Sequence, residues 1–169
     1  MDLLKLRPDA DINIFEIEPS RLPPENERNS RINYHSIGLG GYDNTVSKFS
    51  VKPLWEMMSF LNHTYIDVLK MDIEGFEFQF LKNEGLHLFH RIGQLQVELH
   101  VKRSKGFFAK KIEEDAVYFV EKCEEFGLRL FSNEPNILNT FRATELAFIQ
   151  KNWTDWNNNK HKFHKSSKP

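Results

Sequence analysis

Cysteine is almost absent from this chain of 169 residues, since Cys123 is its one example. A single thiol excludes an intramolecular disulfide and a zinc site built on several cysteines. Positive and negative side chains almost cancel, leaving a formal net charge of −1. A chain so close to neutral has no long-range attraction to nucleic acid or to an anionic membrane surface. We therefore expect no nucleic-acid partner.

Long apolar runs are missing as well. No stretch approaches the roughly 20 apolar residues of a membrane-spanning helix, and Met1 does not open a signal peptide. We expect no membrane segment in this chain. If the chain is complete, these absences favour a cytoplasmic location, and a secretory location stays open if its natural start is missing.

The composition is that of a globular α/β or α+β domain. Hydrophobic residues make up 40% and charged residues 28%, and the length suffices to bury a core. Lysine and histidine concentrate after residue 159. We predict one domain over residues 1–151 and a polar, basic tail over 152–169 that is disordered.

The stretch from Tyr65 to Glu77 joins an apolar run to two carboxylates. The run ends at Met71, and Asp72 and Glu74 follow directly. It predicts a buried strand. In open α/β sheets ligands bind beyond the carboxyl ends of the strands. We therefore expect Asp72 and Glu74 to stand at the functional edge of a sheet.

Strand and helix patterns alternate along the rest of the chain. Strands are predicted at 11–18, 31–37, 45–51, 65–71, 93–101, 128–131 and 143–150, and helices at 53–62 and 112–123. A turn cluster separates two of these strands, between Gly38 and Asn44. The order implies a largely parallel sheet with helices on both faces and an antiparallel edge at the C-terminus.

The segment after Gly75 fits two structures. Phe76, Phe78 and Phe80 alternate as in a hairpin strand, but the wider apolar spacing also fits a helix. We predict the helix, because Asp72 and Glu74 place negative charge near its amino terminus.

Four stretches together resemble FkbM-type methyltransferases, which are class I enzymes that use S-adenosylmethionine. The central one, Asp-Val-Leu-Lys-Met-Asp-Ile-Glu-Gly-Phe-Glu, ends at Glu77, and three more follow the family order at Phe15–Pro19, Tyr34–Gly41 and Gln94–His100. The segment Glu145–Ile149 is similar to the last strand of the animal methyltransferase-like branch. The resemblance spans residues 10–151 and implies a Rossmann-like class I sheet.

The resemblance also implies a cofactor site for S-adenosylmethionine. Glu18 matches the acidic residue that accepts hydrogen bonds from the ribose hydroxyls, a task that suits the paired oxygens of a carboxylate. Ile37, Gly38 and Leu39 match the segment that flanks the adenine.

Three residues match the methyl-transfer edge, Asp72, Glu74 and His100. Methyl transfer needs an aligned acceptor and a group that takes its proton, and any of the three side chains can do this. Carboxylates also bind divalent ions. Two carboxylates do not define a ligand set, so we predict no metal ligands and leave metal dependence open.

The Gly-rich turn that is typical of the family has no match in this sequence. Class I methyltransferases carry a first strand and a Gly-rich turn that cradles the methionine part of the cofactor, whereas the first glycine here is Gly38. Without that strand, the strands at 11–17 and 65–71 would lack a partner. We expect the chain to be a fragment truncated before the second strand of the fold, with residues 1–7 a remnant of the first helix.

These observations leave two functions of different class. The first is a methyltransferase that methylates an oxygen atom of an unidentified small-molecule or glycan acceptor. The second is an inactive methyltransferase-like remnant that acts, if it folds, as an interaction module. The sequence does not indicate an oligomeric state.

Overall fold

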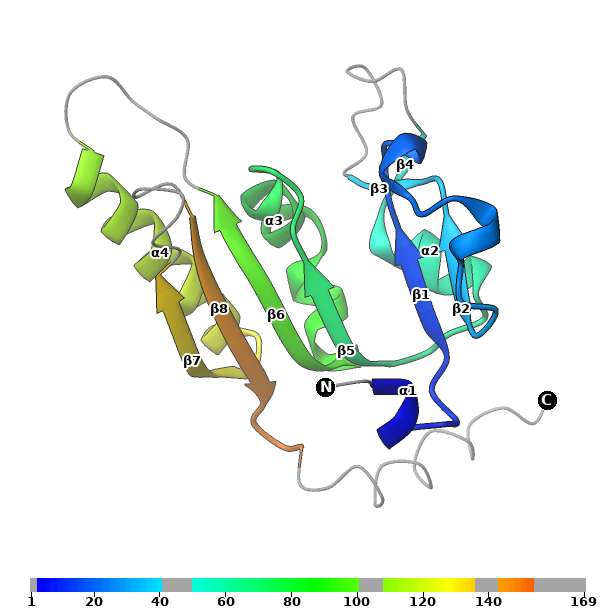
Figure 1. The fold of residues 1–169 in the computed structure, drawn as a ribbon. Coiled ribbons are helices and arrows are strands. Elements are labelled where there is room, and N and C mark those ends of the chain that lie inside the picture. The colour runs from blue at the N-terminus through cyan, green and yellow to red at the C-terminus, as the bar shows by residue number, and fades with distance from the viewer. Residues whose placement is uncertain (1–2, 41–49, 101–107, 136–142, 154–169) are drawn as a thin grey trace. The chain divides into compact units, whose positions relative to one another are not determined.

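The computed structural model describes residues 3–40, 50–100, 108–135 and 143–153 (Figure 1). The chain forms two compact units, Met1–Pro53 and Leu54–Pro169. Each unit is described by itself. Among the described residues, no helix is both long and apolar enough to cross a membrane.

The first unit is built from short elements. They are α1 (Leu3–Leu6), β1 (Ile12–Phe15), β2 (Ile32–His35), β3 (Gly38–Leu39) and β4 (Val51–Lys52), with 3-10 turns at Pro19–Arg21 and Glu25–Glu27. Strands β1 and β2 form one parallel pair, and β3 and β4 form another. The rings of Phe15 and His35 stack across the first pair, with centroids 4.5 Å apart.

The predicted turn from Gly38 to Asn44 is wrong at its first two residues. Gly38 and Leu39 form β3, and the N–H of Gly38 donates to the carbonyl of Ser50 at 2.8 Å. Glycine is required because a Cβ here would lie 2.8 Å from the side chain of Ile17. Residues 41–44 of the predicted turn, and most of the predicted strand at 45–51, lie outside the described residues. Gly40 is described, and its N–H donates to the carbonyl of Lys52 at 3.0 Å.

The second unit carries the longer elements. They are α2 (Leu54–Phe60), β5 (Ile66–Met71), α3 (Glu77–Leu88), a 3-10 turn (Phe89–Arg91), β6 (Ile92–His100), α4 (Phe108–Glu125), β7 (Leu128–Pro135) and β8 (Ala143–Gln150). The sheet order is β5-β6-β8-β7, in which β5 and β6 run parallel and β8 is antiparallel to both its neighbours. The mixed α/β class and the antiparallel C-terminal edge are confirmed.

Two local predictions had different outcomes. The helix after Gly75 is confirmed, since α3 begins at Glu77. Pro135, which lies in the connection expected between the predicted strands at 128–131 and 143–150, is instead the last residue of β7. A proline is tolerated there because β7 lies at the edge of the sheet, where one side of the strand needs no ladder partner.

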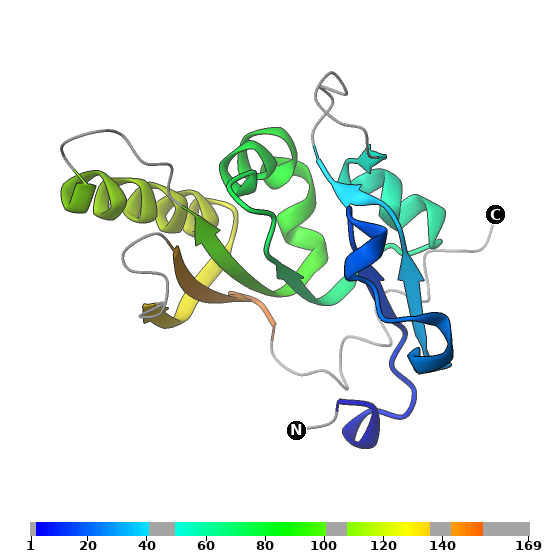
Figure 2. The same cartoon turned by 45° about the horizontal axis from the view of Figure 1, so that its top comes forward.

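Helices α3 and α4 lie on the same side of this sheet (Figures 1 and 2). The face beneath them is apolar, and β6 contributes the buried residues Leu95, Val97 and Leu99 to it. Phe119 of α4 packs near Phe148 of β8, with ring centroids 6.2 Å apart. Each such burial stabilises the fold by about 1.5–3 kcal/mol. The prediction of helices on both faces does not hold for the described part of this unit.

The opposite face of β6 is polar. Strand residues alternate between faces, so the residues of β6 between the buried positions point away from α3 and α4. They are Gln94, Gln96, Glu98 and His100, and all are at least partly exposed. The carboxyl end of this polar face carries the candidate site.

Candidate functional site

The turn between β5 and α3 holds two residues in the left-handed region, Glu74 with φ 55° and Gly75 with φ 98°. The first of these is a strained position, since a non-glycine residue there costs about 1–2 kcal/mol. The turn is secured by Glu77, whose Oε1 accepts from the N–H groups of Ile73 and Gly75, both at 3.2 Å. The first residue of α3 therefore fixes the turn that precedes it.

Glu77 also binds the last residue of β6. The side chain of Glu77 is 0% exposed, and its Oε1 lies 3.0 Å from Nδ1 of His100. An ionised carboxylate can only accept, so Nδ1 carries the proton and donates it to Glu77. This hydrogen bond directs Nε2 of His100 away from Glu77.

Two further carboxylates lie near Nε2 of His100. Oδ1 of Asp72 lies at 3.9 Å and Oε2 of Glu74 at 3.7 Å, both too long for a hydrogen bond. The side chains of Asp72 and Glu74 are 45% and 72% exposed, whereas that of His100 is 18% exposed. The structure thus brings together the three residues predicted at the methyl-transfer edge, with the two carboxylates exposed and His100 mostly buried.

The charges in this cluster shift two pKa values upward. Burial lowers the pKa of His100, but the hydrogen bond and charge of Glu77, with the charges of Asp72 and Glu74, outweigh it and raise the pKa. Burial raises the pKa of Asp72, and the negative charge of Glu98 adds to this effect. A histidine with a raised pKa is suited to take a proton near neutral pH.

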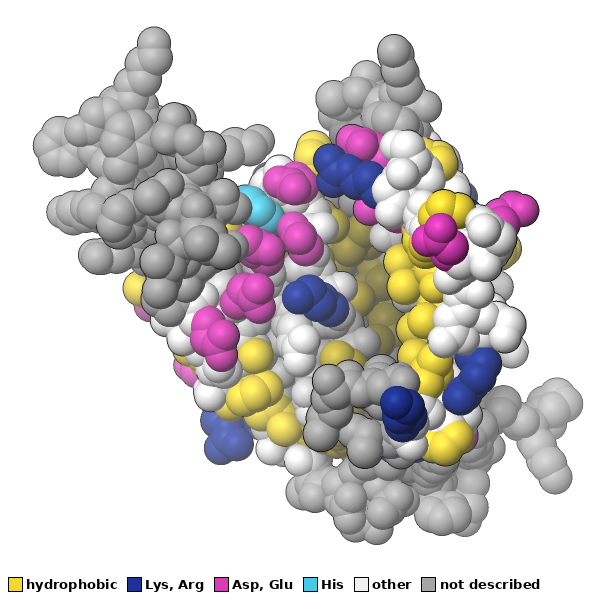
Figure 3. Space-filling view, in the orientation of Figure 1, with side chains coloured by type: hydrophobic (Ala, Val, Ile, Leu, Met, Phe, Trp, Pro, Cys, Tyr) yellow, Lys and Arg dark blue, Asp and Glu magenta, His cyan; other side chains and the backbone are white. Residues whose placement is uncertain are grey.

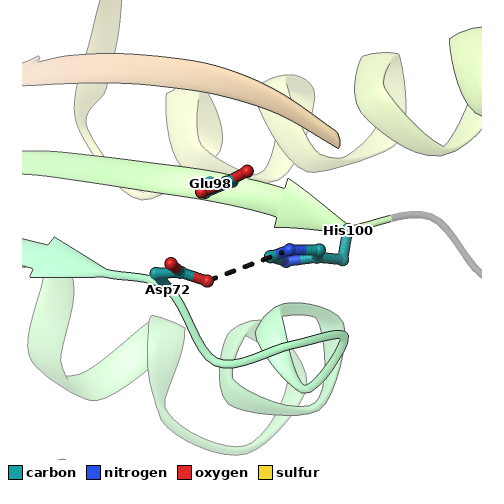
Figure 4. A group of neighbouring side chains, drawn as sticks. All are labelled: Asp72, Glu98 and His100. Atoms are coloured by element: carbon teal, nitrogen blue, oxygen red, sulfur yellow. Dashed lines mark ion pairs between the residues drawn. The ribbon is translucent and has the colours of Figure 1, made fainter. Parts of the chain in front are cut away.

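Glu98 stands beside the same group (Figure 4). One ligand atom from each of Asp72, Glu98 and His100 lies within 4.8 Å of the other two. One imidazole nitrogen and two carboxylate oxygens are groups that hold divalent ions, so these are residues with which this site could hold a metal.

Two residues of this cluster, Glu77 and Glu98, were not predicted from the sequence. A signal existed for Glu98, because it precedes His100 by two positions and strand alternation puts both on one face. A weaker signal existed for Glu77, which shares a helical stripe with Phe80, Leu81 and Glu84. A carboxylate in an apolar stripe is buried only with partners, which the sequence does not name.

The four residues predicted to hold the cofactor lie in the first unit. The carboxylate of Glu18 forms an ion pair with Nε of Arg21 at 3.0 Å and is 41% exposed. Ile17, its neighbour in the chain, packs against Gly38. Glu18 and the segment Ile37–Leu39 therefore belong to one local group.

Residues 50–127 match the family model of the Methyltransferase FkbM domain. This match supports the resemblance of the chain to the FkbM methyltransferase family. It contains α2, β5, α3, β6 and α4, and with them every residue of the cluster around His100. Neither a curated protein nor a solved structure matches the chain. The FkbM match therefore rests on the unit that carries the cluster, and Glu18 lies outside it.

Proposed function

We propose that this chain is a methyltransferase domain that uses S-adenosylmethionine and methylates an oxygen atom of a small-molecule or glycan acceptor. One observation carries the proposal. Within the FkbM match, Nε2 of His100 faces Asp72 and Glu74 at the carboxyl ends of β5 and β6. That is the sheet edge where open α/β folds bind their ligands.

The proposed reaction is a direct displacement. S-adenosylmethionine, when bound, would supply the methyl group: the acceptor oxygen would bond to the methyl carbon as the carbon–sulfur bond breaks, which would leave the neutral thioether S-adenosylhomocysteine. The proton of the acceptor hydroxyl passes to Nε2 of His100 or to the carboxylate of Asp72 or Glu74. Such a positioned base contributes typically 10²–10⁴-fold to the rate. Glu77 is a positioning residue, because it acts through His100.

The cofactor side of the proposal uses the first unit. The carboxylate of Glu18 accepts hydrogen bonds from the ribose hydroxyls, and Ile37, Gly38 and Leu39 flank the adenine. The ion pair between Glu18 and Arg21 is compatible with this role, because it is exposed and worth at most about 1 kcal/mol.

A second function, an inactive interaction module, is favoured by a different observation. Among the described strands, β5 pairs only with β6, so its other edge has no partner in the sheet. An open edge can bind an extended segment of another chain through main-chain hydrogen bonds.

Calorimetry with S-adenosylhomocysteine distinguishes the two functions. The methyltransferase predicts saturable binding of S-adenosylhomocysteine, whereas the interaction module predicts none. In a chain that binds it, Asp72→Ala and Glu74→Ala should lower turnover. Absence of binding would favour the interaction module. Unchanged turnover in both variants would remove the catalytic assignment.

A further inference from the structure

Acidic side chains form a row across the polar face of the β5-β6-β8-β7 sheet. Glu98 of β6 is paired with Glu145 of β8, which is paired in turn with Glu134 of β7. Directly paired residues share a face of the sheet. Figure 3 shows acidic side chains gathered on this face beside a histidine.

Asp72 extends this row at β5. Met71 is paired with Val97, so the next residue along each strand brings Asp72 beside Glu98. Like charges on neighbouring strands destabilise a sheet, and a bound cation would relieve their repulsion.

The group at the end of the row has the composition of a metal site. Asp72, Glu98 and His100 offer two carboxylate oxygens and one imidazole nitrogen within 4.8 Å of one another. Bonds of about 2.1 Å to one ion place such atoms about 3–3.5 Å apart. Asp72 is 45% exposed, so its carboxylate has room to make that small movement.

The contact between Glu77 and His100 is a separate feature that favours a metal site. Metal-binding histidines commonly donate their second ring N–H to a carboxylate, which fixes the tautomer and leaves the other nitrogen to the ion. Glu77 is such a carboxylate, 0% exposed and 3.0 Å from Nδ1 of His100. Its second oxygen, Oε2, is buried without a hydrogen-bond partner. A buried carboxylate that is only partly satisfied is stabilised by positive charge nearby.

We propose that Asp72, Glu98 and His100 bind a divalent transition-metal ion, with Glu77 as the positioning residue for His100. A mixed set of one nitrogen and two oxygens suits Mn²⁺ or Zn²⁺ better than an all-oxygen cage does. Three protein ligands leave positions open for water or for a hydroxyl group. Glu74 lies outside the ligand set and remains available as a proton acceptor.

Metal binding itself does not depend on methyl transfer. That the ion holds the hydroxyl of the methyl acceptor rests on the proposed function. The two ideas are therefore tested with separate probes, metal chloride for the first and S-adenosylhomocysteine for the second.

The test is a titration of the 169-residue chain with MnCl₂. Binding is measured by NMR, as the paramagnetic broadening of backbone amide signals. We expect saturable binding of one ion, with early loss of the signals of Ile73, Leu99 and His100. The same chain titrated with ZnCl₂ in a calorimeter should show a matching stoichiometry. Because the wild-type chain is used, this measurement cannot fail through misfolding of a variant.

Variants then assign the ligands. Asp72→Asn, Glu98→Gln and His100→Phe should each raise the Kd for Mn²⁺ by at least tenfold, and Glu77→Gln should raise it about 10–100-fold. Glu145→Gln is the matched control, because Glu145 neighbours Glu98 on the same face but lies outside the group. It should change the Kd less than twofold, as should the double variant His161→Ala and His164→Ala in the tail.

Three outcomes would overturn the proposal. The first is no saturable binding of Mn²⁺ or Zn²⁺ at millimolar concentration. The second is equal binding by the wild type and by folded Asp72, Glu98 and His100 variants. The third is binding that disappears with His161 and His164, which would identify an adventitious ion in the tail. Binding of S-adenosylhomocysteine without metal binding would overturn this proposal and leave the proposed function standing.

Discussion

Oε1 of Glu77 lies 3.0 Å from Nδ1 of His100, although one residue begins a helix and the other ends a strand 23 positions later. The same oxygen accepts from two N–H groups of the turn after β5. The start of α3, the end of β6 and the strained turn are therefore held by one carboxylate. Its removal should affect all three.

Glu77→Gln is expected to lower the pKa of His100. The amide keeps an oxygen for the turn but carries no negative charge to stabilise the imidazolium, which is the main effect that opposes burial of the ring. The ring proton shifts of His100, followed by NMR as a function of pH, measure this change.

Glu74→Gln is the matched control for that experiment. The side chain of Glu74 is 72% exposed, and its charge contributes less than those of Glu77 and Asp72. Its removal should lower the pKa of His100 by a smaller amount. An equal effect of both variants would show that the hydrogen bond from His100 to Glu77 does not itself raise the pKa of His100.

Glu84→Gln is expected to stabilise the protein at neutral pH. Glu84 is buried on α3, and its carboxylate accepts from the N–H of Trp55 at the start of α2 at 3.3 Å. Burial raises the pKa of Glu84, so the native state holds its proton more tightly than the unfolded state does. The wild type therefore loses stability as pH rises through that pKa, whereas glutamine does not titrate.

Chemical denaturation between about pH 4 and pH 8 measures this difference, since unfolded glutamate titrates near pH 4.3. The advantage of Glu84→Gln should grow with pH and vanish at the acidic end. Glu84→Ala should instead destabilise by about 1–3 kcal/mol, because it leaves the N–H of Trp55 without its acceptor. Lys82→Ala, on the exposed side of α3, is the control and should show no comparable pH dependence. An advantage that is the same at every pH would contradict the assignment to the carboxyl charge.

Gly93→Ala is expected to destabilise the second unit by about 1–3 kcal/mol. Gly93 is buried where β6 passes β5, and a Cβ there would lie 2.8 Å from the backbone carbonyl oxygen of Asp67. A main-chain atom cannot move aside as a side chain can. The free energy of unfolding from urea titration measures the loss, and Gln94→Ala on the polar face should cost under about 1 kcal/mol. Equal losses would show that the approach of the two strands is not tight.

Glu18→Gln is expected to raise the Kd for S-adenosylhomocysteine by about tenfold or more in a chain that binds this ligand. Hydrogen bonds to a charged group are worth about 1.5–3 kcal/mol, and an amide supplies one acceptor where the carboxylate supplies two. Calorimetry measures the change. Glu25→Gln, in the exposed 3-10 turn Glu25–Glu27, is the control and should leave the Kd unchanged. Equal affinities of Glu18→Gln and the wild type would contradict the ribose assignment.

Local pattern was enough to predict most of the elements. The spacing of Leu54, Met57 and Met58 predicted α2, and the apolar run before Asp72 predicted β5. Where prediction failed, a longer-range contact decided the conformation. The sequence around Gly38 and Leu39 is typical of a turn. In the structure, the N–H groups of Gly38 and Gly40 donate to the carbonyl groups of Ser50 and Lys52, and β3 pairs with β4 in parallel.

The sequence alone determined that Asp72, Glu74 and His100 follow or end two successive strands of the chain, and their resemblance to a family suggested the role that we propose for them. Only the tertiary structure decided that Glu77 binds His100, and that Glu98 and Asp72 lie beside each other. Periodicity sets the face on which a side chain stands. Strand register and helix packing, which depend on residues far apart in the chain, decide which of those side chains meet.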